Sequence, residues 1–131
     1  MTQEHKELLL KDLCARLPYG VKVLCLRDFN HDWYNLEMVD IGDNEVYVTT
    51  YEPYANRYVK IEEVKPYLFP LSSMTEQQEE ELIKLINTGQ NDNNEFMRSL
   101  CRIEFYHKNH FDYHGLIPMG LANDATNLNI Y

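Results

Sequence analysis

The chain has 131 residues with 44% hydrophobic side chains, and its 21 acidic and 12 basic residues give a net charge of −9. This is an ordinary size for one domain with one buried core, so we expect a single domain over residues 1–131. The acidic excess disfavours direct nucleic-acid binding, because proteins hold phosphate backbones with Lys and Arg, which are in the minority here.

An amphipathic helix is expected at the start of the chain. Apolar residues recur at helical spacing between Gln3 and Leu17, and Pro18 follows directly. Proline is common just after a helix because it cannot continue the hydrogen-bond ladder. The pattern therefore predicts a surface helix with one buried stripe.

A strand-rich part is expected from about residue 19 to 71. Short segments there alternate polar and apolar residues, and clusters of turn-forming residues separate them at 28–32, 42–44 and 53–56. Parallel neighbours would need crossovers of a dozen or more residues, and these segments lie too close together for that. We expect a small, bent antiparallel sheet of four to five strands, either an SH3-like barrel or an open sheet packed on helices.

The strand-rich part ends at two prolines, Pro66 and Pro70, and a strong helix-start signal follows them. Ser73 or Thr75 can cap this helix, and the acidic residues just after them suit its positive N-terminal end. Gly89 is expected to end it. The helical part of the chain is therefore expected from about residue 74 to 131.

A polar linker at 90–94 separates this helix from a second one, which is expected from Glu95 to about His110 with Asn94 as its cap. Residues 111–131 contain glycine, proline and asparagine turns and read as an irregular tail. Together with the N-terminal half, these elements predict an α+β protein.

Both C-terminal helices and the tail are expected to share the core with the sheet. Each carries apolar residues that would be costly to leave in water. These residues are Leu82, Ile83 and Ile86 in the first helix, Phe96, Leu100, Ile103 and either Met97 or Tyr106 in the second, and Leu116, Ile117, Met119, Leu121, Leu128 and Ile130 in the tail.

Residues that could bind a metal ion crowd together at 107–114. On a continuing helix, His107, His110 and His114 would share one face at spacings of three, four and seven. They could then hold zinc or another divalent ion, with Asp112 or a distant carboxylate completing the shell. The favoured interpretation is that these histidines pack among neighbouring aromatic rings, so we expect no metal and no cofactor.

Aromatic residues in the strand-rich part form a candidate interaction surface for a protein partner. Aromatic rings with polar tips suit half-buried sheet positions and also the contact patches of interaction proteins. Nine acidic residues between Asp28 and Glu63 would ring this surface, against only Arg57 and Lys60. The candidate surface consists of Trp33, Tyr34, Tyr47, Tyr51, Tyr54 and Tyr58.

Common catalytic motifs are missing from the sequence. It has no GxSxG nucleophile elbow, no GxxxxGK[ST] phosphate loop and no GxGxxG turn. We therefore expect no catalytic residue, and a protein more typical of binding than of catalysis. No apolar run approaches the roughly 20 residues that span a bilayer, which predicts a cytoplasmic protein without a membrane segment.

Three blocks of the sequence, at 65–76, 105–117 and 124–131, together with the opening Leu8 to Val23, resemble short uncharacterised proteins encoded by phages and mobile elements of gut anaerobic bacteria. The resemblance covers about half of the chain. Similar proteins often have Arg in the place of His114 and Gly in the place of Asn127. Because Arg does not ligate zinc, the first difference further disfavours a metal site.

The resemblance implies an accessory protein of a phage or mobile element and carries no enzymatic activity. Our leading hypothesis is therefore a non-enzymatic protein that acts through protein–protein interaction. One alternative is a metal-binding protein or metal-dependent enzyme that uses His107, His110 and His114. A further alternative is an acidic mimic of DNA that blocks a basic host protein.

Overall fold

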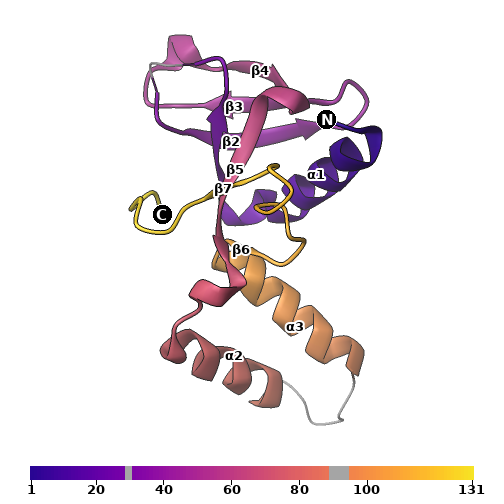
Figure 1. The fold of residues 1–131 in the computed structure, drawn as a ribbon, viewed down its shortest axis with the longest axis vertical. Helices are drawn as coiled ribbons and strands as arrows, with labels where there is room; N and C mark the ends of the chain where they lie inside the picture. Colours follow the sequence, from indigo (N-terminus) through magenta and orange to yellow (C-terminus); the bar gives the residue numbers. More distant parts are fainter. Residues whose placement is uncertain (29–30, 89–94) are drawn as a thin grey trace.

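The structure is a computed structural model that describes residues 1–28, 31–88 and 95–131. It confirms the α+β class, with an N-terminal helix, a mixed sheet and two further helices (Figure 1). Part of the expected turn at 28–32, the helix stop at Gly89 and the linker at 90–94 lie outside the described residues.

Helix α1 spans Gln3–Arg16 and begins at Thr2, whose hydroxyl accepts a hydrogen bond from the backbone N–H of His5 at 3.1 Å. This cap satisfies one of the free amide groups of the first turn. The helix ends in a short 3-10 turn, Leu17–Tyr19, at the expected proline. Its buried side chains are three leucines and, unusually, one ion pair: Leu9, Leu10, Leu13, Asp12 and Arg16.

The first four strands form an antiparallel meander, as expected. They are β1 (Lys22–Cys25), β2 (Tyr34–Asp40), β3 (Glu45–Thr49) and β4 (Arg57–Lys60). Strand β5 (Val64–Pro70) then returns to the free side of β1, and the short strand β6 (Phe111–Asp112) lies beyond it, so the order is β4-β3-β2-β1-β5-β6. No pairing between described strands joins the two ends of this order. The sheet is open, and the barrel alternative is not supported.

Cross-strand rows decide which side chains of the meander are buried. Met38, Tyr47 and Tyr58 are partners in one row across β2, β3 and β4, and Met38 and Tyr58 are exposed. Because successive residues of a strand point to opposite faces, the neighbouring row faces the core. That row consists of three valines, Val39, Val46 and Val59.

Strand β5 has a different partner along each part of its length. Val64–Pro66 pairs antiparallel with β1, whereas Tyr67 and Leu68 pair with β7 (Asn123–Asp124), and Phe69 and Pro70 with β6 (Phe111–Asp112). The last two pairings are parallel, so the expectation of a purely antiparallel sheet was wrong. Two-residue strands carry no alternation that a sequence could reveal, and the long intervening helices allow parallel pairing.

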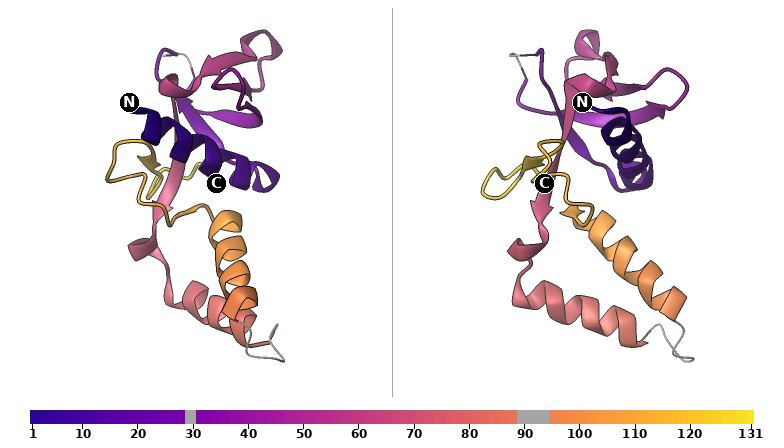
Figure 2. Two further views of the ribbon diagram at one scale, coloured as in Figure 1. Left: turned by 90° about the vertical axis from the view of Figure 1, so that its right-hand side faces the viewer. Right: turned by 45° about the vertical axis from the view of Figure 1, so that its right-hand side comes forward.

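The hydrophobic core lies between α1, the sheet and the tail, and the two C-terminal helices lie outside it. We call α2 (Glu76–Thr88) and α3 (Glu95–Lys108) the hairpin, which projects from the rest of the molecule (Figures 1 and 2). Among the described side chains, none in α2 is buried, and in α3 only Phe105 and His107 are. The expectation that both helices share the core was therefore wrong.

The start of α2 follows the expected local rule. The backbone N–H of Gln78 donates to the Thr75 hydroxyl at 3.1 Å, and the backbone N–H of Thr75 donates to the Gln78 side chain at 2.9 Å. This reciprocal pair is a capping box, which satisfies two amide groups at once. Across the described residues, no helix has both the length and the apolar character needed to cross a membrane.

The tail supplies part of the core, as expected. Leu116 is fully buried and Leu121 is 4% exposed, while Leu128 is half exposed. We predict that Leu116→Ala lowers the free energy of unfolding by about 2–5 kcal/mol, the usual cost of emptying a buried leucine site. Leu128→Ala, the matched control, should change it by no more than about 0.5 kcal/mol in urea denaturation. Equal effects of the two substitutions would contradict the docking of the tail.

Candidate functional site

The three histidines of the sequence-predicted metal site do not share one helix face. Helix α3 ends at Lys108, and His110 lies in the left-handed region with φ of 62°. Nε2 of His107 lies 2.6 Å from the Tyr113 hydroxyl, and the ring of His110 stacks on Tyr131 with ring centroids 3.6 Å apart. Each histidine therefore has its own aromatic or polar neighbour, as the packing interpretation expects.

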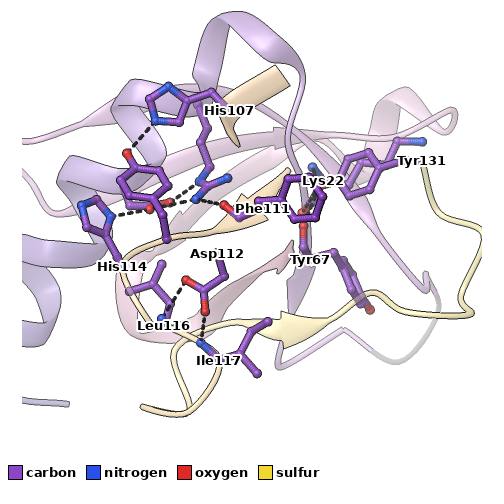
Figure 3. Close-up of polar contacts among 12 residues, drawn as sticks. Lys22, Tyr67, His107, Phe111, Asp112, His114, Leu116, Ile117 and Tyr131 are labelled. Carbon is purple, nitrogen blue, oxygen red and sulfur yellow. Dashed lines mark hydrogen bonds and ion pairs between the residues drawn. The ribbon is translucent and has the colours of Figure 1, made fainter. Parts of the chain in front are cut away.

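His114 belongs to a buried ion-pair cluster instead (Figure 3). Asp12 and Arg16, one turn apart on α1, are both fully buried, and the Arg16 Nε lies 2.6 Å from the Asp12 carboxylate. Nδ1 of His114 approaches the other Asp12 oxygen at 2.7 Å, and Arg16 donates to the Phe111 carbonyl at 2.7 Å. We call these three side chains the clamp, because they join α1 to the segment after α3.

Asp112 also serves a structural role rather than a metal shell. Its two carboxylate oxygens accept hydrogen bonds from the backbone N–H groups of Leu116 and Ile117, each at 2.8 Å (Figure 3). These bonds shape the turn that brings Leu116 into the core.

His110 is neutral around pH 7. Burial of its ring, together with the positive charge of the nearby Arg16, lowers the pKa of His110 to about 4.

The clamp generates a prediction about stability. Arg16→Met should lower the free energy of unfolding by about 3–5 kcal/mol, because it leaves the Asp12 carboxylate buried without its charged partner. Lys6→Met is the control, since it breaks the more exposed Lys6–Glu62 pair and should cost less than about 1 kcal/mol. Both are measured by urea denaturation. Similar losses of unfolding free energy for the two variants would contradict the predicted contribution of the clamp to stability.

A second polar cluster lies in the meander, where the β1–β2 connection meets the segment between β3 and β4. His31 lies between two carboxylates, with Nδ1 3.1 Å from Asp28 and Nε2 2.9 Å from Glu52. The Tyr34 hydroxyl donates to the same Asp28 oxygen, and an Arg57 nitrogen lies 3.7 Å from it. We call these five residues the His31 cluster.

The protonation states of the His31 cluster follow from these contacts. Hydrogen bonding to Asp28, and secondarily to Glu52, raises the pKa of His31. Bonds from Tyr54 and then His31 lower the pKa of Glu52. Burial and the bond to Asp28 raise the pKa of Tyr34 to about 12. Both ring nitrogens of His31 can donate only in the charged ring, so the cluster favours an imidazolium between two carboxylates.

The His31 cluster lines a polar hollow of about 420 Å³ whose mouth carries exposed aromatic rings. Tyr51 and Tyr54, on either side of Glu52 in the chain, are 82% and 83% exposed. Their rings lie at the surface although each is large and mostly apolar. A smaller hollow beside it, of about 170 Å³, lies between His31, Trp33 and Tyr51. Exposed aromatic rings, carboxylates and a concave surface therefore lie together here.

The structure divides the six residues of the sequence-predicted interaction surface into three groups. Tyr51 and Tyr54 stand at the mouth of the hollow, and Trp33 lies half-buried beside it. Tyr34 is fully buried, so it supports the site from beneath and cannot itself meet a partner. Tyr47 and Tyr58 pair with each other on the outer sheet face, with ring centroids 5.0 Å apart.

Sequence reasoning missed His31, and it counted Asp28, Glu52 and Arg57 only as part of the general charge around the aromatic surface, not as partners of one another. His31 and Glu52 are 21 positions apart and meet only because β2 and β3 pair. A signal that could have found them is the aromatic–acidic run Tyr51-Glu52-Pro53-Tyr54, in which exposed rings flank a carboxylate. No local spacing links this run to His31.

The two ring nitrogens of His31 are already engaged. Nδ1 faces Asp28 and Nε2 faces Glu52, so neither is presented as a general base in this arrangement. Over residues 1–28, 31–88 and 95–131, no group of three or more His, Cys, Asp or Glu side chains is arranged to hold a metal ion.

Comparisons with models of protein families, with curated proteins and with solved structures found no match.

The His31 cluster also predicts a pH dependence. A raised pKa in the folded state means that the stabilisation by His31 is fully present below about pH 6.5 and is lost as the pH rises through the raised value. The difference in melting temperature between the wild type and His31→Gln should therefore be larger at about pH 6 than at about pH 9. Glu52 stays charged across this window, because its pKa is lowered.

The same comparison in a Glu52→Gln background sharpens this measurement. In a Glu52→Gln background, the pH-dependent part of the His31→Gln effect should shrink, since one of the two carboxylates that hold the proton is gone. A melting-temperature difference that is the same at both pH values would contradict the assignment of a charged His31.

Proposed function

We propose that this protein is a non-enzymatic interaction protein that binds a basic segment of a protein partner at the hollow beside the His31 cluster. The observation that carries the proposal is the exposure of Tyr51 and Tyr54 on either side of the Glu52 carboxylate. Exposed tyrosines around a concave, acidic surface suit a cationic side chain, which gains from both the ring faces and the carboxylates.

Charge supports a basic partner. The hollows around His31 are lined by the carboxylates of Asp28, Asp32 and Glu52, against the cations Arg57 and, when protonated, His31. The whole chain carries a net charge of −9, which would steer a basic partner toward it. Specific contact at the rings would then add to this general attraction.

The chain's own cations illustrate the kind of contact proposed. The Lys22 ammonium sits 3.8 Å from the centre of the Trp33 ring, and the Arg57 guanidinium lies 5.4 Å from the centre of the Tyr34 ring. Both rings thus already have a cation over one face. The exposed rings of Tyr51 and Tyr54 have the same chemistry and are open to a partner's Lys or Arg.

The biological setting remains the one that the sequence resemblance implies, an accessory protein of a phage or mobile element. The DNA-mimic alternative shares the basic partner but rests on charge alone. It is therefore separated from our proposal by whether the tyrosines matter.

The proposal is tested by fluorescence anisotropy with a labelled Lys- and Arg-rich peptide, and with an acidic peptide of equal length as the negative control. Replacing both exposed rings (Tyr51→Ala with Tyr54→Ala) should weaken binding about tenfold, since each lost aromatic–cation contact is worth on the order of 0.5–1 kcal/mol. Unfolding curves of the variant establish that the fold is retained.

A charge-matched control separates the hollow from general electrostatics. Asp32→Asn with Glu52→Gln removes two carboxylates at the hollow, while Glu79→Gln with Glu80→Gln removes two exposed ones from α2. The first pair should weaken binding more than the second. Equal losses for the two pairs, together with no effect of the tyrosine substitutions and full loss at high salt, would reject our proposal in favour of the DNA mimic.

A further inference from the structure

A third hollow adjoins the two that border the exposed tyrosines. It has a volume of about 500 Å³ and shares His31, Asp32 and Trp33 with the smaller hollow beside Tyr51. We call it the tail hollow, because two of its lining residues lie near the end of the tail. It brings together five large, mainly apolar side chains from four parts of the chain: Leu24 of β1, Trp33 of the β1–β2 connection, Tyr67 of β5, and Leu128 and Ile130 of the tail.

Hydrogen bonds and a cation–ring contact hold the walls of the tail hollow together. The Tyr67 hydroxyl donates to the Asp32 carbonyl at 2.9 Å, which ties β5 to the β1–β2 connection. The Lys22 ammonium donates to the Ile130 carbonyl at 2.9 Å and lies 3.8 Å from the centre of the Trp33 ring. One lysine thus contacts both the tail and the tryptophan. A site whose walls are already joined loses little further freedom when a ligand enters it.

Part of the apolar lining of the tail hollow is in contact with water. Leu128 is 50% exposed, and Leu24, Trp33 and Ile130 are half-buried, whereas Tyr67 is the most buried of the five at 8%. An apolar side chain placed here would be favourable, because apolar surface on both sides leaves water. Hollows of several hundred Å³ that combine an apolar lining with a few polar groups are typical of ligand sites.

The polar lining of the tail hollow favours a cationic partner segment. Its charged groups are the carboxylates of Asp28 and Asp32 and the ring of His31, and none of its described lining residues is Lys or Arg. Asp32 is exposed, so its charge faces an approaching segment. An acidic segment would be repelled at this place, whereas a segment that carries a cation beside an apolar side chain gains from both.

We propose that the tail hollow receives a large apolar side chain of the same partner segment whose Lys or Arg binds at Tyr51 and Tyr54. The inference rests on the proposed function, because the partner is the same. The two binding positions are adjacent, since His31 lines all three hollows and Trp33 borders both the tail hollow and the hollow beside Tyr51. The partner segment therefore combines a basic residue with a large apolar residue a few positions away.

Fluorescence anisotropy with matched peptides tests this pairing on the full chain. Labelled peptides of equal length carry an Arg-Lys pair and, within about four positions of it on either side, either Leu or Ala among Gly and Ser. At least one Leu peptide should bind about tenfold more tightly than its Ala counterpart, because the larger side chain buries more apolar surface. Equal binding of the Leu and Ala peptides at every spacing would overturn the inference.

Substitutions in the tail locate the preference for Leu. Leu128→Ser should reduce it to about threefold or less, because part of the apolar lining is removed. Met119→Ser is the matched control, since Met119 is also in the tail, is 46% exposed and does not line the tail hollow, so the preference should stay near tenfold. Unfolding curves establish that both variants are folded. The same preference in both variants would overturn the placement of the apolar side chain.

The same measurements separate this inference from the proposed function. Tyr51→Ala with Tyr54→Ala should weaken the binding of the Leu and Ala peptides by the same factor, so the preference for Leu persists. Basic peptides that depend on the tyrosines but show no preference for Leu would overturn the inference alone. A Leu peptide without Arg and Lys that binds as tightly as the one with them would overturn the pairing of charge with apolar side chain. No binding of any peptide would overturn both proposals.

Discussion

The fully buried ion pair between Asp12 and Arg16 is the interaction on which the arrangement of the chain depends. Two charges removed from water must be satisfied by each other and by further hydrogen bonds, or the fold loses several kcal/mol. Here His114 and the Phe111 carbonyl provide those bonds. The first helix thereby holds the segment that follows α3, and that segment brings Leu116 into the core and β6 alongside β5.

Tyr131 likewise joins distant parts of the chain through hydrogen bonds, here between β1 and β5. Beyond the Val23–Pro66 pair, Lys22 and Tyr67 are joined through a side chain and not by a direct backbone hydrogen bond. The backbone N–H of Lys22 donates to the Tyr131 hydroxyl, and that hydroxyl donates to the Tyr67 carbonyl, each at 2.8 Å (Figure 3). Burial of the hydroxyl raises the pKa of Tyr131, so it remains a donor at any ordinary pH. A side chain thus completes a backbone ladder.

The parts of the fold that follow local rules could be predicted from the sequence. The Thr75–Gln78 capping box and the end of α1 at Pro18 depend on residues within a few positions of each other. The two-residue strands β6 and β7 and the projection of the hairpin depend on contacts across the whole chain. An amphipathic helix carries the same pattern whether its apolar side meets its own core or another molecule.

The site was predictable only in its aromatic half. Tyr51 and Tyr54 stood out as tyrosines in a strand-rich region, and the structure exposes both of them. The acidic residues were expected around this surface, but the meeting of Asp28 and Glu52 with His31 could not be predicted, because it depends on how the strands pair. Similarly, Asp12 and Arg16 have the spacing of a common surface pair on a helix, and only tertiary packing buries them.

Strand β5 has a consequence for how the two ends of the molecule are connected. Its first part is held in the meander, and its last residues lead into the hairpin, so one short extended segment links the two regions. An extended strand that is hydrogen-bonded along its length resists bending. The hollow and the hairpin are therefore joined through one stiff segment, and the length of β5 sets how far apart they lie.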